Sequence, residues 1–487
     1  MKRTGASGAS VVLAALMLAA CGGGGGGGGT GAPPVTVTPT PSPTPAPTAS
    51  CTLSARQGFA KAVLDEWYLF PGDMARNADP ARYADVQSYI DALTAPARAL
   101  GKDRYFTYIT SIAEETAFYA RGASAGFGLR LAYDPYAQRI VIAEAYEGAP
   151  ALAAGIDRGA RISAVGTSAD SMRTLSSLAA AGGTDAIIAA LGPDEAGVTR
   201  VLRVTDASGT RDVRVTKAEY DIDPVSDRYG AKVISEGGRS YGYVNLRTFI
   251  RSADQQLRDA FQTFRDRGVT DIVVDLRYNG GGLVSTAELF GDLLGRNRNA
   301  SEIFSQTRFR PEKASKDERH FFTAQAQAIA PTRIAFIGTG STASASELVI
   351  NGMLPWLGTN MTLVGGNTYG KPVGQIALDR PECDDRLRVI AFATGNAAGA
   401  GDYFGGLAPR IANSCAAADD LDLPLGDPRE ASVRAAIDFL AGRSCGAPIA
   451  GLISASTTRS IAAVREPTEM LAPARPTTAQ RELPGLF

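Results

Sequence analysis

Histidine is nearly absent from this sequence: among 487 residues there is one, His320. It lies in the polar stretch KDERHFF, which argues against a catalytic triad built on histidine. One histidine, and five cysteines without a CxxC pair, also argue against a zinc site. The formal net charge of −1 leaves no excess of basic residues for nucleic acid. We therefore expect neither a metal cofactor nor a nucleic-acid partner.

Long hydrophobic runs are also scarce, and the most apolar stretch lies near the start. Residues 11–20 are too short to span a bilayer, so residues 1–21 are typical of a signal peptide. The stretch ends in LAAC, which resembles the lipobox of bacterial lipoproteins, where Cys21 would be lipidated. An ordinary cleavage site beside a fortuitous cysteine is the alternative. Because a Gly/Pro/Thr-rich tether follows at 22–50, we expect a lipid-anchored protein of the cell envelope, at the outer membrane facing the periplasm or at the cell surface.

Four further cysteines are predicted to form disulfides, because an exported protein enters an oxidising compartment. We predict the pairs Cys383–Cys415 and Cys51–Cys445. Four cysteines allow three pairings, and the sequence itself does not choose among them.

The remaining pattern predicts a multidomain α/β protein. Residues 51–118 carry apolar side chains at helical spacing, and residues 119–218 contain short alternating strands with a hairpin at Ser208-Gly209. Residues 229–445 alternate strands with helices, which is typical of a mostly parallel sheet. Residues 446–487 are rich in Pro, Thr and Ala without sustained periodicity. We expect this last segment to be a low-complexity tail, disordered or loosely attached.

Three segments of the 229–445 region carry candidate chemistry. Gly280–Gly282 end an apolar strand, and TASASE places Ser344 where another strand turns into a helix. Lys371 and Gln375 fall on one face of a strand, because side chains alternate with a period of two. Ser344 and Glu347 also match a capping box, which is the structural alternative for this serine.

Lys371 has a second candidate role. GGNTYGK, which starts at Gly365, matches most of a phosphate-binding P-loop. The next residue, Pro372, has no hydroxyl for magnesium, and a strand follows where a P-loop needs a helix. We therefore expect no nucleotide.

Four segments, in this order, resemble the C-terminal-processing (tail-specific) peptidases of family S41. The matching segments are DLRYNGGG (275–282), TASASELVINGM (342–353), GGNTYGKPVGQ (365–375) and YFGGLAP (403–409). The resemblance implies a ClpP/crotonase-like α/β catalytic core and a serine endopeptidase that acts on polypeptides without a cofactor.

The same resemblance assigns roles to individual residues. It implies that Ser344 is the nucleophile, that Lys371 is the general base and that Gln375 orients the lysine. It also implies that backbone amides of Gly281 and Ala345 form the oxyanion hole. A lysine base must be neutral, and burial away from carboxylates can lower its pKa from about 10.4 to about 7–8.

Residues 119–218 resemble a PDZ domain, which this family carries at that place. Gly126, Phe127 and Gly128, in GFGLRL, would then offer backbone amides to the carboxylate of a peptide C-terminus. An ordinary β-turn is the alternative for this short motif.

Two features depart from the family pattern. Arg410 follows GGLAP where many relatives carry an acidic residue, and an insertion near 355–360 lengthens the path between the Ser and Lys motifs. The alternative function is a catalytically inactive, peptide-binding scaffold lipoprotein of the same fold, against which the joint presence of Ser344, Lys371 and Gln375 argues.

Overall fold

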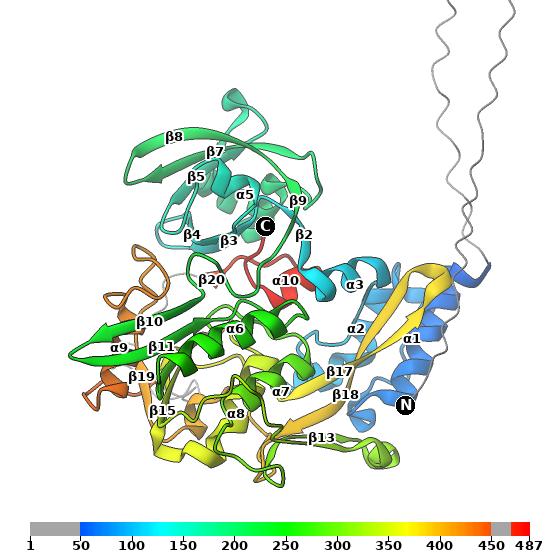
Figure 1. Cartoon of the computed structure of the whole chain (residues 1–487). Coiled ribbons are helices and arrows are strands. Elements are labelled where there is room, and N and C mark those ends of the chain that lie inside the picture. Colours follow the sequence, from blue (N-terminus) through cyan, green and yellow to red (C-terminus); the bar gives the residue numbers. More distant parts are fainter. Residues whose placement is uncertain (1–48, 450–468) are drawn as a thin grey trace, which may run out of the picture. The chain divides into compact units, whose positions relative to one another are not determined.

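The computed structural model describes residues 49–449 and 469–487, to which all structural statements below refer (Figure 1). The predicted signal peptide, Cys21 and nearly all of the predicted tether lie outside these ranges. Within them, no helix has both the length and the apolar composition that crossing a membrane requires.

A six-stranded sheet forms the centre of the region predicted to be catalytic. Its strands lie in the order β10, β11, β12, β15, β16, β19, and only the β10–β11 pair is antiparallel. The bounds are Ala231–Glu236 (β10), Arg239–Asn245 (β11), Asp271–Asp275 (β12), Arg333–Gly338 (β15), Met361–Gly365 (β16) and Ser414–Ala416 (β19). The predicted mostly parallel sheet is confirmed.

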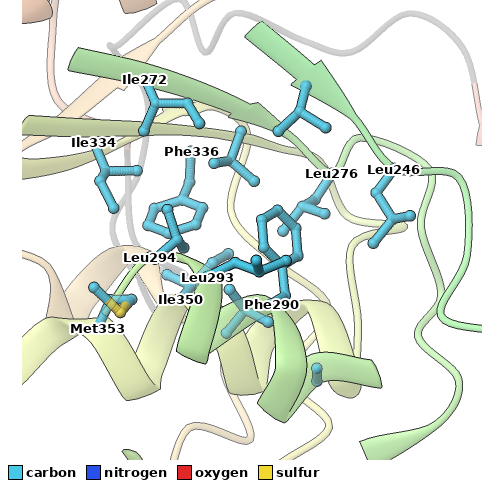
Figure 2. Packing of buried hydrophobic residues seen from close by; sticks show 14 of the residues in the cluster. Leu246, Ile272, Leu276, Phe290, Leu293, Leu294, Ile334, Phe336, Ile350 and Met353 are labelled. Carbon is cyan, nitrogen blue, oxygen red and sulfur yellow. The ribbon is translucent and has the colours of Figure 1, made fainter. Parts of the chain in front are cut away.

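Helices cover both faces of this sheet. One face packs against α6 (Ala253–Asp266), α7 (Val284–Leu293) and α8 (Ala345–Leu357), and the other against α9 (Ala431–Leu440). Because side chains alternate along a strand, Ile272 and Val274 join the first core and Val273 joins the second. Figure 2 shows strand residues of the first core, among them Ile272, Ile334 and Phe336, above the helix residues.

The N-terminal helices share their core with strands from the predicted catalytic region. Leu64 of α1 (Leu53–Trp67) and Ile90 of α2 (Val86–Ala99) pack in one cluster with Val389 and Ile390. The sheet that supplies these valine and isoleucine side chains has five strands, with β17 and β18 paired. Its bounds are Tyr108–Ser111 (β1), Ile303–Phe309 (β13), Glu318–Phe321 (β14), Val373–Arg380 (β17) and Asp385–Gly395 (β18).

Residues 123–221, which we call the β-rich region, follow α3 (Ile112–Arg121). The strands are β2 (Ala123–Gly126), β3 (Leu129–Asp134), β4 (Arg139–Ala145), β5 (Arg161–Gly166), β6 (Arg173–Thr174), β7 (Thr199–Asp206), β8 (Gly209–Thr216) and β9 (Ala218–Asp221). The helices are α4 (Pro150–Ala153) and α5 (Leu175–Leu191). The predicted hairpin is confirmed, because Asp206 of β7 pairs with Gly209 of β8.

Residues 469–487, which we call the strap, form β20 (Glu469–Met470) and α10 (Thr478–Glu482) (Figure 1). Leu483, Leu486 and Phe487 are buried. The prediction of a disordered or loosely attached tail is therefore wrong for the strap. Its apolar side chains are spaced too irregularly to signal a helix or strand, yet they pack against distant parts of the chain.

The predicted disulfide pairing is also wrong. The structure joins Cys51 to Cys383 and Cys415 to Cys445, with Cα–Cα distances of 5.5 and 5.6 Å. Cys51 precedes α1, which packs on the β17–β18 sheet, and Cys383 lies in the connection between those strands. Cys415 lies on the edge strand β19, beside the segment that follows α9.

Replacing Cys51 and Cys383 together by serine is expected to destabilise the fold by roughly 2–5 kcal/mol, because this cross-link closes a very long loop. The measurement is the free energy of unfolding in urea. The matched control is the Cys415/Cys445 double serine variant, which opens a shorter loop and should lose less. Non-reducing peptide maps that link Cys51 to Cys445 would contradict the pairing.

Candidate active site

Ser344 occupies the turn between β15 and α8, at the carboxyl end of a central parallel strand. Its backbone has φ 55° and ψ −114°, a conformation that costs a residue other than glycine about 1–3 kcal/mol. A strained turn from strand to helix is typical of serine nucleophiles, because it exposes the hydroxyl. The helix also begins beside this hydroxyl, so its first backbone amides and the positive end of its dipole lie near Ser344.

The glycine loop after β12 presses against this turn. A Cβ atom at Gly281, whose φ is 123°, would lie 2.7 Å from Cβ of Ser344 and 3.1 Å from the backbone nitrogen of Ala345. Only glycine fits there, and the structure brings the three predicted residues together. The Gly281 N–H donates to Oδ1 of Asn279 at 2.9 Å. In this state the amide is therefore bound, and an oxyanion would have to replace Asn279 as its acceptor.

Lys371 and Gln375 also lie together. Nζ of Lys371 donates to Oε1 of Gln375 at 3.2 Å, and Nε2 of Gln375 donates to the backbone oxygen of Phe106. The Phe106 carbonyl thus fixes which amide atom of Gln375 faces the lysine. The Phe106 ring also contacts the ammonium, with 5.0 Å between Nζ and the ring centroid.

One carboxylate links the serine turn to the lysine turn. Oε2 of Glu347 accepts from the backbone amides of Ser344 at 3.0 Å and Lys371 at 2.7 Å, and Oε1 accepts from Gly370 at 2.6 Å. The backbone nitrogens of Ser344 and Lys371 thus share one acceptor atom, Oε2 of Glu347. Among the described residues no hydrogen bond joins Oγ of Ser344 to Nζ of Lys371, whereas Glu347 links the backbone amides of the two residues.

Burial dominates the electrostatics of this site. It lowers the pKa of the Lys371 ammonium; Glu482 opposes that shift and Arg481 adds to it. Burial also raises the pKa of the Glu347 carboxyl, against the hydrogen bonds that this group accepts. Burial thus shifts Lys371 towards its neutral form, which is the form that can accept a proton.

His320 takes part in a separate cluster. Its Nε2 lies 3.1 Å from Oδ1 of Asp292, and its Nδ1 lies 3.6 Å from Oε2 of Glu288. Burial opposes the charged ring, but the two carboxylates outweigh it and raise the pKa of His320. The residue does not line the cavity that contains Lys371.

That cavity has a volume of about 1100 Å³. Tyr105 lines it from the N-terminal region, Asp134 from the β-rich region, Gly280 and Lys371 from the core, and Glu482 from the strap. Such a space is large enough for a stretch of polypeptide. Within the described ranges no group of three or more His, Cys, Asp or Glu residues is arranged to hold a metal ion.

The predicted peptide-binding loop has an occupant. Backbone amides of Gly128 and Leu129 donate to the backbone oxygen of Phe487 at 3.0 and 3.1 Å. A Cβ at Gly126 would lie 2.7 Å from the carbonyl carbon of Phe487, so this glycine permits the close approach. Phe127 is fully buried and supports the loop from the core of the β-rich region.

Sequence reasoning missed several residues of this site. Asn279 lies inside the DLRYNGGG segment, but its bond to the Gly281 amide was not predicted. Phe106 lies in no motif, and only the fold brings it beside Gln375. Glu347 was predicted only as a helix cap; its contact with Lys371 depends on a segment much later in the chain.

Part of the chain is similar to a known family of peptidases. Residues 240–394 match the model of peptidase family S41, and this range contains Gly281, Ser344 and Lys371.

Carboxyl-terminal-processing proteases are among its homologues. One from Picosynechococcus sp. is 26% identical over 267 residues, 54% of this chain and 58% of that protein. The chloroplastic carboxyl-terminal-processing peptidase 2 of Arabidopsis thaliana is 30% identical over 168 residues, 33% of this chain and 30% of the relative. The matches thus span less than two thirds of the length of these relatives. A crystal structure named as a candidate S41 protease from Bacteroides fragilis has the same fold, with a TM-score of 0.62, 21% identity and coverage of 79% of this chain and 97% of that one.

Replacing Glu347 by glutamine is expected to destabilise the protein by about 1–3 kcal/mol, because the amide has one acceptor oxygen for three backbone donors. The measurement is the free energy of unfolding, compared with Glu195→Gln as the control. Glu195 is exposed and should tolerate the same change. Equal stability of both variants would contradict the role assigned to Glu347.

Proposed function

We propose that the chain is an exported serine endopeptidase that cleaves polypeptides through an acyl-enzyme. Ser344 is the nucleophile, Lys371 is the general base and Gln375 orients the lysine. The observation that carries the proposal is the Glu347 carboxylate, which binds the backbone amides of both Ser344 and Lys371. A serine on a strained turn, linked through Glu347 to a lysine whose pKa is lowered by burial, is an arrangement suited to nucleophilic catalysis.

Acylation begins when neutral Lys371 accepts the proton of the Ser344 hydroxyl. The serine oxygen then bonds to the substrate carbonyl carbon, and the negative charge of the tetrahedral intermediate moves to the carbonyl oxygen. Lys371 gives the proton to the departing amine as the peptide C–N bond breaks. The products of this half are a free amine and an ester on Ser344.

Deacylation repeats these steps with water. Lys371 takes a proton from the water, the hydroxide oxygen attacks the ester, and the proton returns to Ser344 as the acid leaves. In both halves the amides of Ala345 and Gly281 stabilise the oxyanion. Ala345 is the first residue of α8, so its amide has no acceptor within the helix. The Gly281 amide exchanges Asn279 for the oxyanion when substrate binds.

Substrate recognition is assigned to the β-rich region as a PDZ-like domain. Its loop at Gly126–Gly128 receives the end of a polypeptide, which adds to β3 as a strand. The LAAC sequence supports attachment to a membrane through lipid on Cys21, with the enzyme in the cell envelope. The catalytic steps use side chains and water alone, without metal or nucleotide.

Ser344→Ala is expected to lower the rate of peptide hydrolysis by on the order of 10⁴-fold or more, because the variant lacks the serine oxygen that forms the ester of the acyl-enzyme. The measurement is cleavage of casein or of a quenched fluorescent peptide. Ser341→Ala, which removes another hydroxyl of the same turn, is the control and should keep most of the rate. Equal activity of Ser344→Ala and the parent would exclude this nucleophile, and inactivity of every chain would favour a scaffold.

Activity is expected to rise with pH as Lys371 loses its proton, because only the neutral amine can activate Ser344. Burial lowers the pKa of Lys371, so the midpoint of this rise should lie below the ordinary lysine value of about 10.4. The measurement is kcat/KM across the neutral and alkaline range. Lys371→Arg, which keeps the charge but does not deprotonate, should lose both the rise and most of the rate. A rise that persists in this variant would assign the base elsewhere.

A further inference from the structure

The open edge of β3 is occupied by the strap. The Phe487 N–H donates to the Leu129 oxygen at 2.9 Å, and the Leu129 N–H donates to the Phe487 oxygen at 3.1 Å. Two residues along, the Leu131 N–H donates to the Gly485 oxygen at 2.7 Å. This two-residue repeat is that of an antiparallel strand pair, so residues 485–487 bind as an added strand.

The beginning of the strap occupies the rest of that edge. The Leu471 N–H donates to the Leu131 oxygen at 2.9 Å, and Met470 of β20 pairs with Ala132. Both the N–H and the carbonyl oxygen of Leu131 are therefore hydrogen-bonded to the strap. An incoming peptide finds no free edge along residues 129–133 while the strap is in place.

The side chains at the end of the strap show which chemistry fits the groove. Phe487 is 2% exposed and packs in the core of the β-rich region, in the cluster that contains Phe127 and Ile187. Leu486 and Leu483 are buried in a neighbouring cluster. Full burial of a large apolar side chain contributes about 1.5–3 kcal/mol. The groove therefore suits a polypeptide with bulky apolar residues at its end.

The middle of the strap lies on the active-site loop. The Gly280 N–H donates to the Glu482 oxygen at 2.9 Å, and a Cβ at Gly280 would lie 2.3 Å from the Arg481 oxygen. The Arg481 guanidinium donates to the backbone oxygen of Tyr105 at 3.0 Å. Arg481 and Glu482 line the same cavity as Lys371. The segment that fills the peptide groove thus also narrows the access of substrate to the catalytic lysine.

We infer that the strap is the resident ligand of the β3 groove and that it restricts the access of substrate to the active site until a polypeptide with a bulky apolar end displaces it. The second half of this inference rests on the proposed peptidase function. A ligand carried on the same chain acts at an effective concentration of the order of millimolar. Free peptides therefore compete only if they bind tightly or are presented at high local concentration.

Phe487→Asp in the full chain is the variant that tests this inference. A carboxylate in the apolar pocket carries a large desolvation cost, so the strap should leave the groove. Thr477→Asp adds the same charge at an exposed position of the strap outside the cavity, where aspartate also caps α10, and it serves as the matched control.

Binding is measured first, in the Ser344→Ala background, so that it does not depend on hydrolysis. The probe is a fluorescent pentapeptide, Leu-Pro-Gly-Leu-Phe, with a free carboxylate. The chain with Phe487→Asp should bind it about tenfold or more tightly than the parent and the Thr477→Asp chain, because the competing strap has left the groove. Equal binding by all three chains would overturn the inference.

Hydrolysis is measured second, with Ser344 intact, on a quenched fluorescent peptide that is cleaved internally. Phe487→Asp should raise the rate about tenfold or more over both comparison chains. Improved binding with an unchanged, measurable rate of hydrolysis would overturn the inference that the strap restricts access to the active site. Improved binding with no hydrolysis in any chain would support the resident ligand and sink the proposed peptidase instead.

The unmutated chain gives an independent measurement if the variant does not fold. Excess pentapeptide should speed hydrogen exchange of the segment that contains the Gly280 amide, because α10 leaves it. The segment with Leu131 should stay protected, because the peptide replaces the strap there. Unchanged exchange at Gly280 under saturating peptide would contradict the inference.

Discussion

The site depends on a buried carboxylate that accepts hydrogen bonds from three backbone amides and from the side chain of Thr368. Glu347 lies on α8, in the packed core, and binds the amides of Ser344, Gly370 and Lys371. Because these three partners are main-chain groups, Glu347 positions two turns of the chain and not merely two side chains. The Ser344 turn and the Lys371 turn are therefore both hydrogen-bonded to a residue of one helix, which is the support that the proposed catalytic geometry needs. Leaving such buried donors without an acceptor is costly, so the carboxylate also stabilises the fold.

The strap and one arginine connect this site to the β-rich region. Arg130 of β3 donates to the backbone oxygens of Tyr278 and Pro484, each at 2.9 Å. Tyr278 precedes the glycine loop and Pro484 belongs to the strap, so the guanidinium of one β3 residue contacts both the segment before the glycine loop and the strap. Arg130 is 1% exposed and also pairs with Glu144. The strap and the segment before the glycine loop thus share one hydrogen-bonding partner, Arg130.

Local patterns predicted much of the fold and of the candidate site. The apolar runs around Val273 and Phe336 predict buried parallel strands, because helices cover both faces of the sheet. The small residues around Ser344 indicate the tight turn that the glycine loop requires. The predicted contact between Lys371 and Gln375 is present. The alternation of side chains along a strand does not fully explain it, because Lys371 precedes β17 and the strand register shifts after Gly374.

Contacts between distant segments could not be predicted. The disulfide partners depend on how α1 packs on β18, and the strap depends on an open edge of β3 that no pattern near Phe487 signals.

The most direct test of the account is to locate the acyl group during turnover. The chain is mixed with a peptide substrate, quenched rapidly in acid, digested and mapped by mass spectrometry. The account predicts an acyl group on the peptide that contains Ser344, which disappears in Ser344→Ala. An acyl group on another residue would contradict it, and so would turnover without an acyl-enzyme at any quench time.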